Sequence, residues 1–241
     1  MLEILKTNDQ IKKARAELVR RGFSTLDNQF QSWLRRFRLR RASQIGDIVK
    51  SWDVLKTIQF IEDSLPKNAR ILDIGAYASE IPVALHRAGY TNLTAIDLNP
   101  GVLEMPFAGN IDYRIGDFMA TPYEDGTMDA VTAISVIEHG FDGTRLAKEV
   151  GRLLRPGGYF IASFDFWPEK IDTSGTKFFD MDWLIFSRED VLAFCETART
   201  CQLEPVGDFD FTAGDRVIDC AGKNYTFGWM VLQRKAARNS R

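Results

Sequence analysis

Acidic residues stand where three short apolar runs of the sequence end. Asp73 precedes Gly75 by two positions, Asp97 closes the second run, and Asp117 follows a glycine after the third. In a parallel α/β sheet, ligands bind beyond the carboxyl ends of the strands, where turns expose backbone N–H groups. A carboxylate at the end of the second strand is suited to accept both hydroxyls of a ribose. The spacing therefore predicts a ligand site that gathers these three carboxylates.

The elements that must position these carboxylates alternate between strand and helix. Apolar runs and their breaks predict strands over 70–74, 93–97, 111–115, 129–134 and 158–164, and helices over 80–88, 100–105, 142–153 and 187–200. Strands separated by helices pair in parallel with right-handed crossovers. Two further strands, over 203–211 and 225–232, are joined by a polar linker, so we expect them to form an antiparallel pair at one edge.

Residues 1–65 are predicted to form a helical extension of a domain that spans residues 66–241. The expected helices run over 1–22, from about 25 through 41, and from about 47 to 65. Residues 1–50 carry a net charge of +7, which leaves −9 for the rest of the chain. The basic residues gather in the stretch 35–41. This stretch either meets an anionic partner, such as nucleic acid, or forms a solvated helix face that docks on the acidic body.

Composition places the chain among soluble globular proteins. It has 241 residues, of which 45% are apolar and 27% charged. No stretch resembles a signal peptide or approaches the roughly 20 apolar residues of a membrane span, so we expect a cytoplasmic protein. The three cysteines include no C-x-x-C pair, which favours free thiols over a disulfide or a zinc site.

Four motifs fall at the ends of the predicted strands. They are Asp73-Ile74-Gly75-Ala76-Tyr77-Ala78-Ser79, Ala95-Ile96-Asp97-Leu98-Asn99-Pro100, Gly116-Asp117-Phe118 and Leu153-Leu154-Arg155-Pro156-Gly157-Gly158. Together they resemble the class I S-adenosylmethionine-dependent methyltransferases. The resemblance covers roughly residues 50–165 well and the C-terminal strand pair loosely, and residues 1–45 lie outside it. It implies a Rossmann-like, seven-stranded, mostly parallel sheet with an antiparallel last strand and helices on both faces.

The resemblance also implies which residues bind S-adenosylmethionine. The turn that contains Gly75, Ala76 and Tyr77 lies against the methionine part of the cofactor, together with Asp73. The remaining implied contacts are Asp97 with Leu98 at the ribose and Asp117 with Phe118 at the adenine. Ser135 is expected to line the methionine end, and Glu138 to be structural or to contact the cofactor and not to act as an acid–base group.

One departure from the family pattern concerns the first motif. The family carries three glycines there, whereas in this chain Tyr77 and Ser79 replace the second and third. Because backbone approaches a ligand most easily without a Cβ, either the loop takes a wider path, with Tyr77 folded outward or over the ligand, or cofactor affinity is reduced. A nicotinamide dehydrogenase is disfavoured, because G-x-G-x-x-G counted from Gly75 would need glycines where Tyr77 and Glu80 stand.

Methyl transfer needs a nucleophile held in line with the methyl carbon, and a proton acceptor if the nucleophile is a hydroxyl or a protonated amine. His139, after the fourth strand, is the predicted base because an imidazole has a pKa near ~6.5. The alternative is that it hydrogen-bonds its loop or caps the next helix. Asp165, after the fifth strand, could orient the acceptor, and Phe166 with Trp167 could either wall a pocket or pack beneath a loop.

The sequence thus predicts a methyltransferase that acts on a small molecule or a sugar or glycan precursor, at oxygen first and nitrogen next. The apolar segment 169–186 is expected to form a substrate lid, and no metal site is predicted. Two alternatives stay open. One is a nucleic-acid methyltransferase that uses the basic stretch, and the other is a non-catalytic scaffold that keeps the fold or the cofactor.

Overall fold

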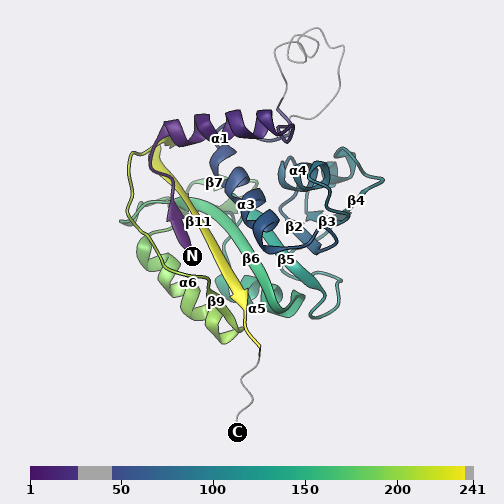
Figure 1. Ribbon diagram of the computed structural model, residues 1–241. Coiled ribbons are helices and arrows are strands. Elements are labelled where there is room, and N and C mark those ends of the chain that lie inside the picture. Colours follow the sequence, from purple (N-terminus) through teal and green to yellow (C-terminus); the bar gives the residue numbers. More distant parts are fainter. Residues whose placement is uncertain (27–44, 237–241) are drawn as a thin grey trace.

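The computed structural model describes residues 1–26 and 45–236, and its centre is a mixed β-sheet (Figure 1). The main path of the sheet runs in the order β1, β11, β6, β5, β2, β3, β4. These strands are β1 (Leu2–Ile4), β2 (Arg70–Ile74), β3 (Asn92–Asp97), β4 (Ile111–Ile115), β5 (Met128–Ile134), β6 (Leu154–Phe166) and β11 (Lys223–Arg234). From β6 to β4 neighbouring strands are parallel, whereas β11 is antiparallel to both β6 and β1. The predicted Rossmann-like sheet with a reversed last strand is confirmed.

Helices cover both faces of the sheet (Figure 1). Successive strand residues point to opposite faces, and Ile71 and Leu72 accordingly belong to two different apolar clusters. The helices that share the cluster of Ile71 are α1 (Asn8–Arg20), α3 (Ser51–Ser64) and α4 (Ile81–Arg87). Those that share the cluster of Leu72 are α5 (Gly143–Leu153) and α6 (Arg188–Thr200). A short 3-10 helix, η1 (Pro100–Glu104), follows β3 as predicted.

The prediction of a helix over residues 1–22 is wrong at its start. Leu2 and Ile4 are buried in β1, where Leu2 pairs with Met230 and Ile4 with Gly228. The helix α1 begins only at Asn8, after Thr7, whose amide donates to the Gln10 side chain at 3.0 Å. Alternating burial of two apolar residues on a sheet edge outweighs the helical spacing, because pairing with β11 satisfies backbone groups that the edge would leave open.

Three short strands share the outer edge of β11. β9 (Leu203–Pro205), β1 and β10 (Ile218–Cys220) each pair with a different part of it. The expected antiparallel pair therefore exists, but its first strand ends at Pro205 instead of residue 211. Beyond it the chain packs along the N-terminal segment, where the Asp210 and Asp215 amides donate to the carbonyls of Leu2 and Lys6.

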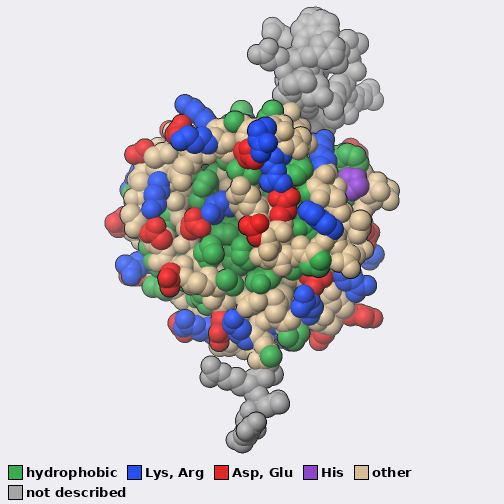
Figure 2. Space-filling view, in the orientation of Figure 1, with side chains coloured by type: hydrophobic (Ala, Val, Ile, Leu, Met, Phe, Trp, Pro, Cys, Tyr) green, Lys and Arg blue, Asp and Glu red, His purple; other side chains and the backbone are tan. Residues whose placement is uncertain are grey.

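The arginine-rich stretch 35–41, and the helix predicted through it, lie outside the described residues. Figure 2 shows positive and negative side chains mixed over the visible face of the described part, with no continuous area of one sign. The thiols of Cys195, Cys201 and Cys220 are free, as predicted. Across the described residues, no helix has the length and apolar character to cross a membrane.

A buried ion pair ties the N-terminal helix to the start of α4. Arg15 of α1 donates to both carboxylate oxygens of Glu80, at 3.0 and 2.7 Å. Thr25 adds its amide and hydroxyl to the same carboxylate. The Glu80 side chain is only 1% exposed, so its charge depends on these donors. The pair fixes α1 beside the loop that follows β2.

Arg15→Ala is expected to lower the free energy of unfolding by about 3–5 kcal/mol, because it leaves the Glu80 carboxylate buried without its cation. Urea denaturation checks this. Lys13→Ala is the matched control, since Lys13 lies on the same helix, is 79% exposed and pairs with Asp9 in solvent. Equal effects of the two substitutions would contradict the structural role of the Arg15–Glu80 pair.

Candidate cofactor and acceptor site

The sheet brings together the strand ends that carry the three predicted carboxylates. β2 lies between β5 and β3, and β4 pairs with the far side of β3. Asp73 is opposite Thr132 on one side and Ala95 on the other, and Asp97 is opposite Ile115, two residues before Asp117. All these strands are parallel, so their carboxyl ends meet at one edge of the sheet.

Asp73 is buried, with 2% of its surface exposed. Its Oδ1 accepts a hydrogen bond from the Thr132 hydroxyl at 2.5 Å, while Oδ2 has no partner among the described residues. Burial raises the pKa of Asp73 to about 7, and the nearby charge of Asp97 adds to the rise. This carboxyl group is therefore suited to a cationic partner, whose charge would stabilise its ionised form.

The loop after β2 folds back from the sheet edge. Gly75 has a φ of +66°, and a Cβ there would overlap the Val136 side chain, so glycine is required. The Tyr77 amide donates to Asp97 Oδ2 at 2.9 Å, and its ring packs on Gly101, where an added Cβ would lie 2.6 Å from the ring. The ring of Tyr77 thus lies against η1, and the residue is 38% exposed. The Ala76 side chain packs in the core.

The other two strand ends keep their carboxylates partly exposed. Asp97 Oδ1 accepts the Asn99 amide at 2.7 Å, and Leu98 beside it is 57% exposed. Asp117 accepts the Met119 amide at 2.8 Å and pairs with Arg145 at 3.1 Å. These backbone bonds hold the carboxylates in place while leaving oxygen lone pairs available. Half-buried Phe118 adds an apolar surface next to Asp117.

The loop after β5 presents three buried polar atoms without partners in the part of the chain that the structure describes. They are Ser135 Oγ, Glu138 Oε2 and His139 Nδ1, and the first two belong to residues that are 8% and 1% exposed. The backbone of Ser135 is held by its amide, which donates to both the hydroxyl and the carbonyl of Ser163 on β6 at 3.1 Å. The loop is therefore fixed, whereas its polar side-chain atoms remain able to bind a ligand.

Two further carboxyl groups lie beside Glu138. Asp165 at the end of β6 accepts the Trp183 indole N–H at 2.7 Å, and Asp53 of α3 accepts the Ser163 hydroxyl at 2.6 Å. Burial raises the pKa of Asp53 and of Asp165 to about 6. Burial, followed by the charge of Asp165, raises the pKa of Glu138 well above its usual range.

The sequence analysis missed Asp53. The available signal was its position between Trp52 and Val54 on the apolar face of a helix, where an acidic residue is unusual.

His139 is half-buried between two aromatic rings, with centroid distances of 5.8 Å to Phe178 and 5.5 Å to Phe179. Burial, assisted by the charge of Lys50, lowers its pKa to about 4. The sequence prediction relied on a pKa near ~6.5. At neutral pH the imidazole is therefore uncharged and a weaker proton acceptor than that prediction assumed.

Segment 169–186, which the sequence predicts to form a substrate lid, follows β6 and packs against the loop after β5. It contains a hairpin of β7 (Lys177–Phe178) and β8 (Met181–Asp182). The Gly140 amide donates to the Asp182 carbonyl at 2.8 Å, and the Leu184 amide to the Glu138 carbonyl at 2.9 Å. Phe166 is fully buried in the core, which agrees with the packing alternative for that residue.

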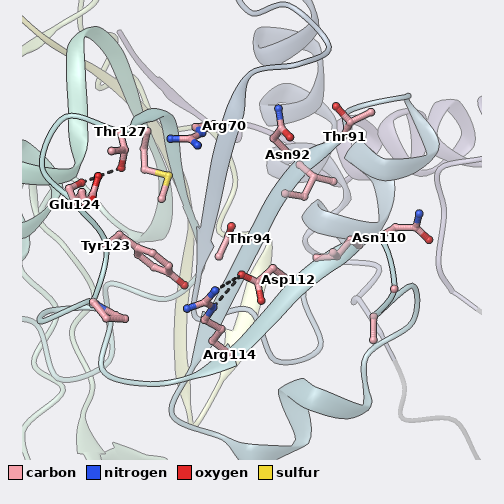
Figure 3. A pocket seen from close by; sticks show the side chains of 16 residues that line it. Arg70, Thr91, Asn92, Thr94, Asn110, Asp112, Arg114, Tyr123, Glu124 and Thr127 are labelled. Atoms are coloured by element: carbon pink, nitrogen blue, oxygen red, sulfur yellow. Dashed lines mark hydrogen bonds and ion pairs between the residues drawn. The ribbon is translucent and has the colours of Figure 1, made fainter.

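A polar cavity of about 630 Å³ lies elsewhere (Figure 3). Residues where β2, β3 and β5 begin line it, among them Arg70, Asn92 and Met128. Arg114 on its wall is paired with Asp112. None of the predicted site residues lines this cavity. In the described ranges, no group of three or more His, Cys, Asp or Glu side chains is placed to hold a metal ion.

Comparison with known proteins agrees with this geometry. Residues 72–162 match the family model for a methyltransferase domain. A ubiquinone/menaquinone biosynthesis C-methyltransferase, UbiE, of Methylobacterium nodulans is 29% identical over 141 residues, which cover 55% of this chain and 56% of that protein. A ubiquinone biosynthesis O-methyltransferase of Methylocella silvestris is 37% identical over 100 residues, 39% of each chain. The chain thus matches about half or less of the length of these curated relatives.

Solved structures show the same fold. A SAM-dependent methyltransferase of Methanosarcina mazei has a TM-score of 0.57 at 16% identity, covering 73% of this chain and 97% of that one. The [4+2]-cyclase SpnF has a TM-score of 0.59 at 17% identity, covering 82% and 86%. The resemblance to class I S-adenosylmethionine-dependent methyltransferases is therefore confirmed. The match to the methyltransferase domain model covers residues 72–162.

The buried carboxyl group of Asp53 predicts a pH dependence. Its pKa is about 6 in the folded protein against 3.8 ordinarily, so its stabilising contribution is complete below pH 4 and is lost as the pH rises through 6. The unfolding free energy of Asp53→Asn minus that of the wild type should therefore be about 3 kcal/mol larger at pH 8 than at pH 4. Urea denaturation at both pH values measures this gain.

Asp112→Asn is the control for this measurement, because water solvates that carboxylate on the edge strand β4, where its side chain is 49% exposed. A gain for Asp53→Asn no larger than that of the control would contradict the burial cost assigned to Asp53.

Proposed function

We propose that this chain is an S-adenosylmethionine-dependent methyltransferase that acts on a small molecule. The observation that carries the proposal is the set of buried polar atoms without partners in the described residues, Asp73 Oδ2 and Ser135 Oγ, beside the strand ends of Asp97 and Asp117. They lie within or directly next to the elements of a methyltransferase domain.

The residues present fit the cofactor. Asp73 and Ser135 would hold the ammonium group of its methionine part, and Asp97 would accept the ribose hydroxyls. Asp117 would meet the adenine amino group, with Phe118 against the ring. When bound, the cofactor supplies a methyl group on a positively charged sulfur. Carboxyl groups around that position favour the charge, whereas they would repel a pyrophosphate.

The protein's contribution to the reaction is position and exclusion of water. The Glu138–Gly140 loop and the hairpin on it enclose the acceptor side of the site. Holding the nucleophile in line with the methyl carbon supplies most of the acceleration for such a displacement. Glu138 or Asp165 would accept a proton from an acceptor that carries one.

The acceptor is proposed to be a small molecule or a sugar precursor methylated at oxygen or nitrogen. The relatives are named for O- and C-methylation in ubiquinone biosynthesis, which supports a compact acceptor. Aromatic side chains on the acceptor side, Phe178, Trp183 and Tyr225, pack edge to face and would suit an apolar body on that molecule.

Isothermal titration calorimetry with S-adenosylmethionine and with its demethylated product tests cofactor binding. The wild type is expected to bind both. Asp97→Asn should weaken binding at least tenfold, or about 1.4 kcal/mol, because an amide accepts from ribose hydroxyls with one oxygen instead of two and carries no charge.

Asp112→Asn, on the neighbouring strand and lining the distant cavity, should bind like the wild type. The absence of heat and of thermal stabilisation with either ligand in the wild type would contradict the proposed function and favour a scaffold that keeps only the fold.

A further inference from the structure

Three carboxyl groups from three separate elements form a cluster on the acceptor side of the site. They are Asp53 of α3, Glu138 after β5 and Asp165 at the end of β6, and they are 0%, 1% and 5% exposed. Hydrogen bonds link all three to the loop after β5: the Ser163 hydroxyl donates to Asp53 and accepts from the Ser135 amide. The Trp183 indole donates to Asp165, and the amide of the next residue, Leu184, donates to the Glu138 carbonyl. We call these three residues the acidic cluster.

The acidic cluster accepts hydrogen bonds from uncharged donors. Asp53 accepts from the Ser163 hydroxyl and the Val54 amide, and Asp165 from the Trp183 indole. Among the pairs formed between described residues, none of the three carboxyl groups makes an ion pair. Lys50 lies close enough for its charge to oppose the pKa rise of all three. Lys50 is therefore a nearby cation for all three carboxyl groups, but no ion pair within the described residues neutralises them.

A second observation points from the cluster to a ligand. Glu138 Oε2 is buried and accepts no hydrogen bond from any described residue. Ser135 Oγ, three residues earlier on the same loop, is likewise buried without a partner in residues 1–26 and 45–236. Native proteins rarely leave buried polar atoms without a partner unless a ligand or water completes them. Both atoms belong to the loop that follows β5, and β5 is the sheet neighbour of β2.

We propose that the acceptor is an amine that enters as an ammonium ion, is held by the acidic cluster, and transfers a proton to Glu138 Oε2 before methylation. This inference rests on the proposed function and deepens it by naming the acceptor class. A phosphate, carboxylate or phenolate would face three acidic groups of like charge. A neutral hydroxyl acceptor needs a single base, whereas an ammonium group has three N–H donors for three acceptors.

Trp183 and Tyr225 lie beside Asp165, where the indole N–H of Trp183 donates to the carboxyl group. Burial raises the pKa of Glu138, which makes its carboxylate a better proton acceptor than an exposed glutamate. His139, with a pKa near 4, is not suited to that role.

The proposed reaction conserves protons and electrons. The ammonium N–H bond breaks, its proton goes to Glu138 Oε2, and the nitrogen keeps the electron pair. That pair forms the N–C bond to the methyl carbon while the S–C bond breaks, and the electrons of the S–C bond neutralise the sulfur. The product is a methylated ammonium and a neutral thioether, and the protonated Glu138 returns its proton to solvent.

The test uses two series of probes, and within each series the compounds have a similar shape but differ in charge. The first series is butylamine, butanol and butyrate, and the second is benzylamine, benzyl alcohol and benzoate. Each is titrated into the full chain saturated with S-adenosylhomocysteine, and methyl transfer from labelled S-adenosylmethionine is measured. We expect at least one amine to bind and react at least tenfold better than its alcohol, and the carboxylates to do neither. The inference is overturned if no amine binds, or if an alcohol or carboxylate exceeds its matched amine.

The variant Glu138→Gln distinguishes a role of Glu138 in proton transfer from a purely structural role. Its rate with the best amine should fall at least 100-fold at pH 7, while S-adenosylhomocysteine affinity stays within threefold. The remaining rate should rise about tenfold per pH unit below the pKa of the amine, because the free base no longer needs Glu138. Glu189→Gln, on the exposed surface of α6, should behave as the wild type.

A wild-type rate and pH profile in Glu138→Gln would overturn the role of Glu138. Failure of the wild type to bind S-adenosylhomocysteine would instead contradict the proposed function, and with it the inference. Normal binding of S-adenosylhomocysteine without preference for amines contradicts the inference alone.

Discussion

Desolvation of carboxyl groups near one edge of the sheet is the physical constraint on which the proposed site depends. Asp73, Asp53, Glu138 and Asp165 are all nearly inaccessible to water, and burial is the largest cause of the raised pKa of each. Hydroxyl and N–H donors offset only part of the cost of removing these groups from water. A fold retains such an arrangement most readily where a positively charged ligand completes it, and sulfonium and ammonium ions both meet that requirement.

The N-terminal region contacts the elements that carry these carboxyl groups. β1 extends the sheet along β11, and the Arg15–Glu80 pair holds α1 against the loop after β2. The following helix, α3, contributes Asp53, whose bond to Ser163 reaches the hydroxyl that also supports Ser135. A chain of direct contacts therefore joins the N-terminal helices to both the cofactor side and the acceptor side of the site.

The sequence predicts the parts of the fold that depend on local pattern. β2 and β4 were expected with the bounds observed, and the three motif carboxylates lie at neighbouring strand ends. β1 was missed because it has three residues and its partner, Met230, is more than 200 positions away. The pKa of His139 could not be foreseen either, since it depends on burial between Phe178 and Phe179, which the later hairpin supplies. Pairings and burial of this kind are tertiary effects that local pattern does not encode.

Proton release on cofactor binding reports whether the buried carboxyl groups sense the charge of the bound ligand. A cation placed beside carboxyl groups of raised pKa lowers those pKa values, so protons are released when it binds. Calorimetry near pH 6.5 in buffers of different ionisation enthalpy counts these protons. The account predicts that S-adenosylmethionine, with its sulfonium charge, releases more protons than its neutral thioether product. Equal proton release by the two ligands would show that no buried carboxyl group senses the sulfonium and would contradict the account.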